Sequence, residues 1–314
     1  MTINNPNTDS QDNSPDEIND GEFSIVLLPD TQYYTRLSPS TFPTLAQWIA
    51  DNASRYNIQA VLHVGDVVDN NQAAQWENAN AAWDILDAAE IPYLLAIGNH
   101  DYDTFSSADR LSTAWNTFLP QNRYTGCTWW NGGFFEEGKS ENAFLLLTIA
   151  GTGYIFLSLE FGPRDEVLSW ANDLLKTYAS QTAIIITHSY LYHDGTRVKP
   201  GTEHNPKDYE LGATAHDGED MWEKLVNLHN NVLLVLSGHH INGENAARRS
   251  DRTTGGSIVH QLFANWQDTD RDTAYGWLRL LTFGKNCIRV QTFSPVSGQK
   301  LVDEANEFEL SYKL

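Results

Sequence analysis

The sequence predicts an α/β fold of four layers (α/β/β/α), in which two mixed β-sheets pack face to face and helices flank them on the outside. Short apolar runs rich in β-branched residues alternate with segments of helical periodicity through the first part of the chain. Toward the end of the chain, apolar runs follow one another without intervening helices. The alternation predicts parallel strands joined by helices, and the final runs predict strands that complete the sheets.

The first apolar run, residues 23–29 (FSIVLLP), closes at a Pro-Asp turn, as expected of a strand buried on both faces. Residues 40–56 place Phe42, Leu45 and Ile49 at helical spacing, which predicts a helix. The alternation continues with a strand at 60–64, a helix at 76–89 and a strand at 92–97. We therefore expect parallel neighbours joined by right-handed crossovers.

A second group of elements follows residue 140. A turn at residues 151–153 predicts that the strands on either side of it, 143–149 and 154–159, form an antiparallel pair. The same patterns predict helices at 166–178 and 217–228, and strands at 183–187, 232–237, 258–264, 277–283 and 288–293.

Two segments depart from this pattern. Residues 1–22 are rich in Asn, Asp, Ser and Pro, which predicts a disordered acidic and polar tail before a single domain at residues 23–314. Residues 103–140 are rich in aromatic residues, Gly and polar residues, which predicts an insertion that forms a long loop or a cap. Its large rings either wall a pocket for an organic leaving group or pack in the core; they are Trp129, Trp130, Phe134 and Phe135.

The charge balance restricts the class of partner. The chain has 41 acidic and 20 basic residues and a formal charge of −21. A surface of that charge repels polyanions, so we expect neither a nucleic acid polymer nor a membrane as the partner. A small phosphate ester is compatible, because metal ions set the potential inside a pocket whatever the global charge.

Cysteine content and hydropathy bear on location. Two cysteines without metal-ligand spacing exclude a disulfide framework. No apolar run approaches the ~18 residues that cross a bilayer, and residues 1–22 lack the apolar region of a signal peptide. We expect a soluble protein that is cytoplasmic, or secreted or periplasmic if a leader was removed.

Residues with metal-binding side chains recur at the ends of the predicted strands. Each lies within two residues of the carboxyl end of a buried strand: Asp30, Asp66, Asn99, His188 and His239. Ligands of open α/β sheets bind at that edge, so these side chains are expected to converge on one crevice. A single Asp there is an ordinary turn or cap residue, but five such positions in succession favour a metal site.

These positions occur in blocks that read Asp30-Thr31-Gln32, Gly65-Asp66-Val67-Val68-Asp69, Gly98-Asn99-His100-Asp101, Thr187-His188 and Gly238-His239-His240-Ile241. The blocks resemble those of the calcineurin-like metallophosphoesterase superfamily, D-x-H, G-D-x-x-D, G-N-H-[DE], a strand-ending His, and G-H-x-H. The resemblance covers about residues 23–295 and includes a bacterial branch of the superfamily with D-T-Q in the first block.

The resemblance implies a metallophosphoesterase fold and a dinuclear centre. It implies that Asp66 bridges two divalent ions, that Asn99, His188 and His239 complete one site, and that Asp30 belongs to the other. A shared carboxylate offsets the repulsion between the ions, and a bridging hydroxide then attacks phosphorus. Mixed oxygen and imidazole ligands suit Mn, Fe, Zn or Co better than Mg or Ca.

The resemblance also assigns roles beside the metals. It makes His100 the general acid that protonates the leaving oxygen, with Asp101 orienting its ring; a structural hydrogen bond is the alternative. Asp69 is expected to accept a hydrogen bond from a ligand or from the Asn99 loop, or else to cap a helix.

Two departures from the family pattern concern the site around Asp30. Gln32 and Ile241 stand where the family has histidines, so this site lacks two imidazoles and is expected to bind metal more weakly. We favour the carbonyl oxygen of Gln32 as a replacement ligand and leave His240 and His260 as open alternatives.

Substrate contacts are expected from loops that follow the strands. Arg164 and Arg197 are candidates for binding phosphate, although either can equally be a surface ion-pair partner. The other candidates for lining the pocket are Tyr33, His193, His240, His260 and Asn265.

The sequence therefore predicts a metal-dependent phosphomonoesterase or phosphodiesterase that acts on a small-molecule phosphate ester. The alternative is a non-catalytic metal-binding or regulatory protein on the same fold with one strong metal site, and Gln32 and Ile241 motivate it. Natural substrate and oligomeric state are left open by the sequence.

Overall fold

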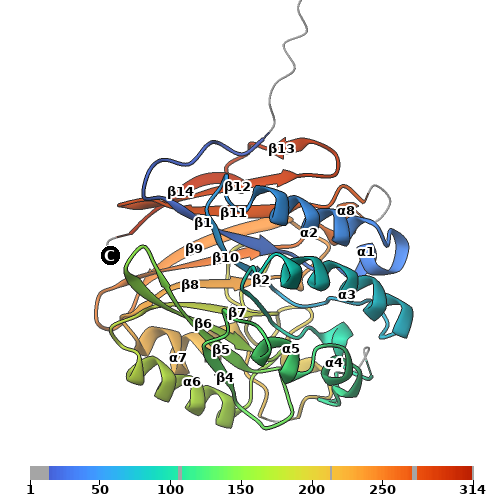
Figure 1. Cartoon of the computed structure of the whole chain (residues 1–314). Helices are drawn as coiled ribbons and strands as arrows, with labels where there is room; N and C mark the ends of the chain where they lie inside the picture. The colour runs from blue at the N-terminus through green and yellow to red at the C-terminus, as the bar shows by residue number, and fades with distance from the viewer. Residues whose placement is uncertain (1–13, 105–107, 213, 271–273, 313–314) are drawn as a thin grey trace, which may run out of the picture.

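The computed structural model describes residues 14–104, 108–212, 214–270 and 274–312. Two seven-stranded sheets form its centre (Figure 1). The first sheet has the order β13 (Gln299–Leu301), β12 (Cys287–Ser294), β11 (Leu278–Phe283), β1 (Phe23–Leu28), β2 (Ile58–His63) and β3 (Tyr93–Leu95), with β14 (Glu307–Ser311) paired to β12. The second has the order β4 (Gly132–Phe134), β5 (Ala143–Ile149), β6 (Thr152–Leu159), β7 (Thr182–Thr187), β8 (Val232–Ser237), β10 (Ile258–Ala264) and β9 (Ala246–Arg252).

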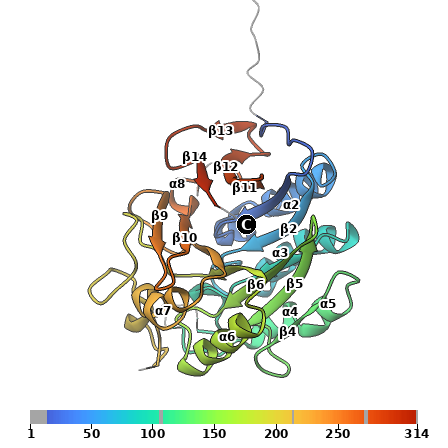
Figure 2. The same cartoon turned by 90° about the vertical axis from the view of Figure 1, so that its left-hand side faces the viewer.

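Helices cover the outer faces of both sheets, as Figures 1 and 2 show. The helices that pack on the first sheet are α1 (Gln32–Leu37), α2 (Thr41–Asn52) and α3 (Ala73–Ala88), and those on the second are α6 (Asp165–Thr177) and α7 (Gly218–Lys224). Three apolar layers result, one between the sheets and one under each set of helices. The protein is thus a four-layer α/β/β/α sandwich of two mixed sheets, as the sequence predicts.

Strand β1 is covered on both faces, which explains why its sequence is mainly apolar. Val26 and Leu28 pack under the helices, whereas Ile25 and Leu27 face the second sheet. Alternate side chains of a strand point to opposite faces, and both faces of β1 are covered. Its six residues are all buried.

The parallel pairs determine where the polar loops gather. β1, β2 and β3 are parallel, and so are β6, β7, β8 and β10. Because parallel strands end at the same edge, the loops after β1, β2 and β3 meet, as do those after β7 and β8.

The expected disordered tail is wrong for residues 14–22. The backbone N–H of Asp16 donates to Gln291 (3.1 Å), Glu17 pairs with Arg55, and Glu22 pairs with Arg289 (3.2 Å). These contacts hold the segment against the first sheet and α2. Residues 1–13 of the expected tail lie outside the described residues.

Residues 103–140 are less irregular than expected. The described part contains α4 (Thr113–Phe118), α5 (Gln121–Thr125) and the edge strand β4. Trp129 lies 5.3 Å from Tyr93 between ring centroids, and Phe135 lies 5.6 Å from Trp170. Tyr93 is the first residue of β3, so Trp129 packs at the opposite end of that strand from the polar loops, and core packing is the alternative that the structure supports.

The helix at 217–228 is shorter than expected, since α7 ends at Lys224 and a 3₁₀ turn (Val226–Leu228) follows. The expected run of strands near the end is interrupted by α8 (Gln267–Asp270), which lies between β10 and β11.

Candidate metal centre

Three of the predicted ligands form a compact buried cluster. Asp66 follows β2 of the first sheet, while His188 and His239 follow β7 and β8 of the second. One donor atom of each lies within 4.8 Å of the donors of the other two. The two sheets therefore bring together a carboxylate and two imidazoles that are far apart in sequence.

The hydrogen bonds of the two histidines leave defined nitrogens for a cation. Nδ1 of His188 lies 2.8 Å from the carbonyl oxygen of Val64, so Nδ1 carries a proton and Nε2 is the nitrogen that could bind a cation. In His239, Nε2 donates to the carbonyl of His204 (3.0 Å), and Nδ1 lies 3.1 Å from Nε2 of His188. Both free nitrogens thus face the same point.

The remaining ligand candidates surround this pair. Nε2 of His188 lies 3.2 Å from Oδ1 of Asp66 and 3.1 Å from Oδ1 of Asn99. The carboxylate of Asp30 accepts hydrogen bonds from the backbone N–H of His239 (3.2 Å) and from Nδ2 of Asn265 (2.9 Å). Asn265, which the sequence offered for substrate binding, therefore contacts a candidate ligand.

Glycines beside the ligands leave no room for a larger residue. A Cβ at Gly98 would lie 2.1 Å from Oδ1 of Asp66, and one at Gly238 would lie 2.1 Å from Oδ1 of Asp30. Asp66 and His239 themselves have positive φ values of 52° and 79°. Non-glycine residues in this region are strained, and such strain is concentrated at functional sites.

His63, at the end of β2, joins two of the ligand loops from behind. Its Nδ1 accepts from the backbone N–H of Gly65 (3.1 Å), and its Nε2 donates to Oγ1 of Thr31 (3.0 Å). Burial and the neighbouring His188 lower the pKa of His63 to about 3, so the ring is neutral. The ring is fully buried, in the role of a core residue.

The electrostatics of the cluster suit a cation. Burial opposes protonation of His188, but the carboxylates of Asp66 and Asp30 outweigh it and raise its pKa to about 9. Burial and the charge of His188 lower the pKa of His239 to about 3. Burial, reinforced by Asp66, raises the pKa of Asp30 well above its usual value. A proton on His188 thus balances the buried carboxylates, a role that a metal ion can take over.

The surroundings of His100 require one correction. Nδ1 of His100 contacts the backbone carbonyl of Asp69 and lies 3.8 Å from its carboxylate. The carboxylate of Asp101 instead accepts from the backbone N–H groups of Gly98 (2.9 Å) and Val68 (3.1 Å). Asp101 therefore shapes the loop, and Asp69 occupies the position beside the ring that the family resemblance implied for Asp101.

Two residues that were expected to bind substrate have their side chains engaged by other parts of the protein. Arg197 is 4% exposed, bonds to Gln261, Glu219 and Asp251, and stacks on Trp222 at 3.9 Å. Its charge is fully engaged within the second sheet and α7. The ring of His260 contacts Ser250 Oγ (2.7 Å) and the carbonyl of Ser311 (2.9 Å), which directs it to β9 and β14 rather than to the strand ends.

Among the other expected residues, His240 and His193 belong to a series of ring contacts that begins at His239. The ring of His240 is 4.7 Å from that of His239, and its Nε2 contacts Ser189 Oγ at 3.3 Å. His193 stacks on Tyr192, whose ring also contacts His240. Arg164 binds Glu160 (2.9 Å) and Glu136 (3.1 Å), in the ion-pair role that was its alternative. Tyr33 is half-buried in α1, next to Gln32.

Sequence reasoning missed the aromatic wall of the cluster. Phe161, after β6, lies 5.0 Å from the ring of His239, and Tyr209 lies 5.1 Å from Phe161. Arg36 of α1 was also missed, and its guanidinium binds the Asp69 carboxylate beside His100. No motif marks these residues, although Phe161 follows a strand end like the ligands.

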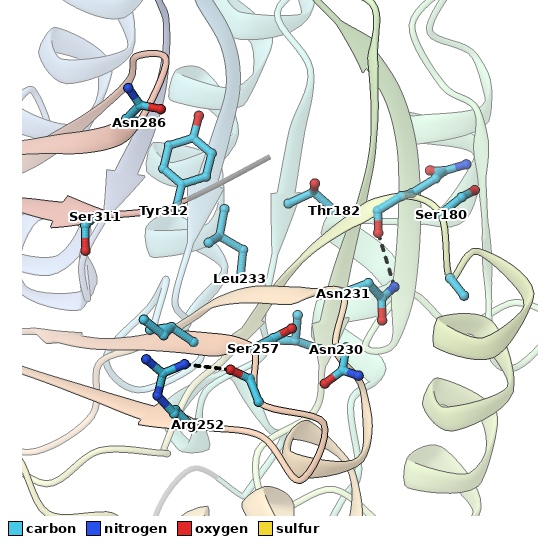
Figure 3. Close-up of a pocket in the computed structure, with 15 residues that line it drawn as sticks. Ser180, Thr182, Asn230, Asn231, Leu233, Arg252, Ser257, Asn286, Ser311 and Tyr312 are labelled. Carbon is cyan, nitrogen blue, oxygen red and sulfur yellow. Dashed lines mark hydrogen bonds between the residues drawn. The ribbon is translucent and has the colours of Figure 1, made fainter.

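A cavity of about 710 Å³ lies elsewhere, at the starts of β7, β8 and β10 (Figure 3). Thr182, Leu233, Ser257 and Tyr312 are among the described residues that line it. None of these lining residues belongs to the metal cluster. Among the described helices, none combines the length and apolar character needed to cross a bilayer.

The donor set fits a divalent metal. Carboxylate, amide oxygen and neutral imidazole are ligands of Mn, Fe, Zn and Co, and both histidines have the second nitrogen bonded to a backbone carbonyl, as metal-binding histidines do. The side-chain Oε1 of Gln32 is buried without a hydrogen-bond partner, which is consistent with an oxygen that binds a cation.

Comparison with known proteins gives concordant results. The chain is 30% identical over 307 residues to the uncharacterized protein YvnB of Bacillus subtilis (strain 168), covering 93% of this chain but only 22% of that protein. It is 26% identical over 234 residues to a probable cyclic nucleotide phosphodiesterase of Moraxella catarrhalis (strain BBH18), covering 72% and 73% of the two chains.

A dimetal phosphatase from Danio rerio has a similar fold, with a TM-score of 0.57, 13% identity and coverage of 93% and 99% of the two chains. The family model described as calcineurin-like phosphoesterase matches residues 23–242. With the strand-end cluster and the two-sheet sandwich, this match shows that the chain belongs to the calcineurin-like phosphoesterase family.

Proposed function

We propose that the protein hydrolyses phosphate esters with two divalent metal ions held at the ends of β1, β2, β7 and β8. The observation that carries this proposal is the buried cluster of Asp66, His188 and His239 in a member of this family. Divalent ions bound there would act as Lewis acids on the phosphate and lower the pKa of a bound water.

The residues of the chain have distinct parts in this proposal. Asn99, His188 and His239 would hold one ion, Asp30 and Gln32 would hold the other, and Asp66 would contribute to both. His100 protonates the leaving oxygen, and the backbone carbonyl of Asp69 contacts its ring at Nδ1. His100 is partly exposed, with 27% of its side chain accessible, as a group that meets substrate must be.

We infer a preference for phosphodiesters from the ion pairs that three arginines make. Arg36 is paired with Asp69, and both Arg110 (2.9 Å) and Arg164 (2.9 Å) are paired with Glu160. These guanidinium charges are largely neutralised, and a dianionic monoester gains more from unpaired cations than a monoanionic diester does. The resemblance to a probable cyclic nucleotide phosphodiesterase agrees with this preference.

The metal requirement is tested with bis(4-nitrophenyl) phosphate and 4-nitrophenyl phosphate. Protein freed of metal with a chelator should be inactive and should recover turnover with Mn²⁺, with the higher kcat/KM for the diester. His188→Ala should remain inactive after addition of Mn²⁺. His229→Ala, a control whose ring bonds Asn172 away from the cluster, should behave as the wild type. An inactive wild type that holds one ion per chain would favour a non-catalytic metal-binding protein.

The role of His100 is tested by the leaving group. His100→Ala should lose about 10²-fold or more in kcat on esters with an alkoxide leaving group. The loss should be much smaller on nitrophenyl esters, whose leaving group needs no proton. Equal losses on both substrates would assign His100 a structural hydrogen bond instead.

A further inference from the structure

We propose that the two cation sites of this centre differ in chemistry. The site of His188 and His239 selects a borderline ion such as Zn²⁺, whereas the site of Asp30 is built from oxygen donors and selects a hard divalent ion such as Mg²⁺ or Mn²⁺. This inference rests on the dinuclear centre of the proposed function and specifies what each half of it binds.

The imidazoles are gathered on one side of Asp66. Nε2 of His188 and Nδ1 of His239 lie 3.1 Å apart, and Nε2 of His188 is also within 3.2 Å of both Asn99 and Asp66. One ion placed among these atoms uses both free nitrogens. Imidazole nitrogen favours Zn²⁺, Fe²⁺ and Co²⁺ over Mg²⁺ and Ca²⁺.

The side of Asp30 offers oxygen instead. The backbone N–H of Thr31 donates to the carbonyl of Asp66 (3.1 Å), which holds the first ligand loop against the second. Gln32 follows directly, is 2% exposed, and its Oε1 accepts no hydrogen bond. A buried carbonyl oxygen without a donor costs free energy unless a cation or water meets it.

A second amide oxygen is in the same condition. Oε1 of Gln267 is buried without a partner, and the backbone N–H of Gln267 donates to Asn265 (3.0 Å), whose side chain binds Asp30. Gln32, two residues after Asp30, and Gln267, two residues after Asn265, thus each have a buried amide oxygen without a hydrogen-bond partner. Carboxylate and amide oxygens are the ligands that Mg²⁺ and Mn²⁺ prefer.

His240 follows His239 directly and is the alternative source of a nitrogen ligand for the site of Asp30. Its Nε2 contacts Ser189, and its ring packs on Tyr192 (4.8 Å) and Phe263 (6.3 Å). Phe263 belongs to the apolar layer under α6 and α7, on the outer face of the second sheet. The His240 ring also lies 4.7 Å from that of His239, and its Nδ1 is buried without a hydrogen-bond partner. None of these contacts joins His240 to Asp30, and its variant is therefore part of the test below.

The test counts metals on the full chain after chelator treatment and dialysis. Against micromolar Zn²⁺ alone, the wild type should retain one zinc per chain. Against Zn²⁺ with millimolar Mg²⁺ or Mn²⁺, it should retain one zinc and one hard ion. Two zinc ions bound with equal affinity in the wild type would overturn the proposal.

Variants of Gln32 identify the site. Gln32→His adds the imidazole that is missing and should raise the Zn²⁺ affinity of the second site at least about tenfold, to two zinc ions per chain. Gln32→Ala should weaken Mn²⁺ binding by about tenfold, as measured by calorimetry, while one zinc remains bound. Gln47→Ala, an exposed glutamine of α2, is the matched control.

The outcome is separable from that of the proposed function because it is read from metal content. A chain that binds one zinc and one hard ion but hydrolyses no ester would refute the activity and support the two-site chemistry. Turnover by a chain that binds two zinc ions would support the activity and refute the difference between the two sites. A loss of hard-ion affinity in His240→Gln, with Gln32→Ala unchanged, would also overturn the assignment of Gln32.

Discussion

At the scale of single residues, each candidate ligand is fixed by a bond on its far side. Val64 holds His188, the carbonyl of His204 holds His239, and Asn265 holds Asp30. These contacts choose the tautomer of each ring and the direction of each donor before any cation binds. The cluster is therefore organised by the protein itself.

The protonation of His188 predicts a pH dependence of stability in the metal-free protein. Its pKa is raised to about 9 from the usual 6.5, so the ion pair with Asp66 contributes fully below about pH 6.5 and is lost as the pH rises through 9. The shift corresponds to at most about 3 kcal/mol of unfolding free energy. Thermal melts in chelator should show Tm falling between pH 7 and 9.5.

His188→Gln is the control for this dependence, because it retains a polar side chain without a titrating group. Its Tm should be nearly flat over the same interval. With saturating metal the wild-type trend should weaken or reverse, since metal binding requires the neutral ring. A wild-type Tm that does not fall in chelator would contradict the assignment of the proton to His188.

The convergence of Asp66, His188 and His239 could be predicted because it depends on local patterns alone. A buried strand followed by a polar residue places that residue at the sheet edge, whatever the rest of the fold. The partner of His100 could not be predicted in this way. Whether Asp69 or Asp101 faces the ring depends on which carboxylate the backbone amides of the loop capture, and only the folded loop decides that.

At the scale of elements, the segment between β7 and α7 closes one side of the centre. It supplies the carbonyl of His204 to His239 and the ring of Tyr209 to the aromatic wall. Its end is fixed by Asp217, the fully buried N-cap of α7, which accepts from the backbone N–H of Asp220 (3.1 Å). Asn205 (3.1 Å) and Lys207 (3.1 Å) also bind this carboxylate.

Asp217→Ala is expected to destabilise the protein by about 1–2 kcal/mol, because it removes the helix cap and the anchor of this segment. Chemical denaturation should show a lower midpoint with an unchanged slope. Metal affinity should fall as well, since the His204 carbonyl loses its support. Glu210→Ala, at an exposed acidic residue of the same segment, should leave the midpoint unchanged; equal effects would argue against the cap.

Sequence patterns located the buried elements more reliably than the exposed ones. Buried strands such as β8 (VLLVLS) have an apolar signal that marks them. The edge strand β9 reads AARRSDR. Charged residues keep an edge strand from pairing with other chains, and they also remove the apolar pattern by which a strand is recognised in the sequence. The short helix α1, with only part of its surface buried, was missed for a related reason.

At the scale of the whole molecule, stability depends on the apolar layer between the sheets. Phe283 of β11 is 1% exposed and stacks on Phe23 at 4.7 Å. It also contacts Tyr154 of the second sheet (6.3 Å) and Tyr312 (6.0 Å). This ring therefore links both sheets and the end of the described chain.

Phe283→Ala should lower the free energy of unfolding by about 3–5 kcal/mol, because it leaves a cavity between the sheets. Phe283→Leu, which preserves most of the volume, should cost clearly less. Denaturation of the metal-free variants measures both effects. Similar losses in the two variants would show that the layer repacks around the site.

The hydrogen bond from His239 to Asp30 crosses between the two halves of the sandwich, because Asp30 follows the first sheet and His239 the second. Ions bound beside it would have ligands from both sheets and would therefore link the two halves of the sandwich. Release of the ions and separation of the two sheets would then occur in a single cooperative transition. The heat resistance of the loaded protein should accordingly follow the concentration of free metal in the medium.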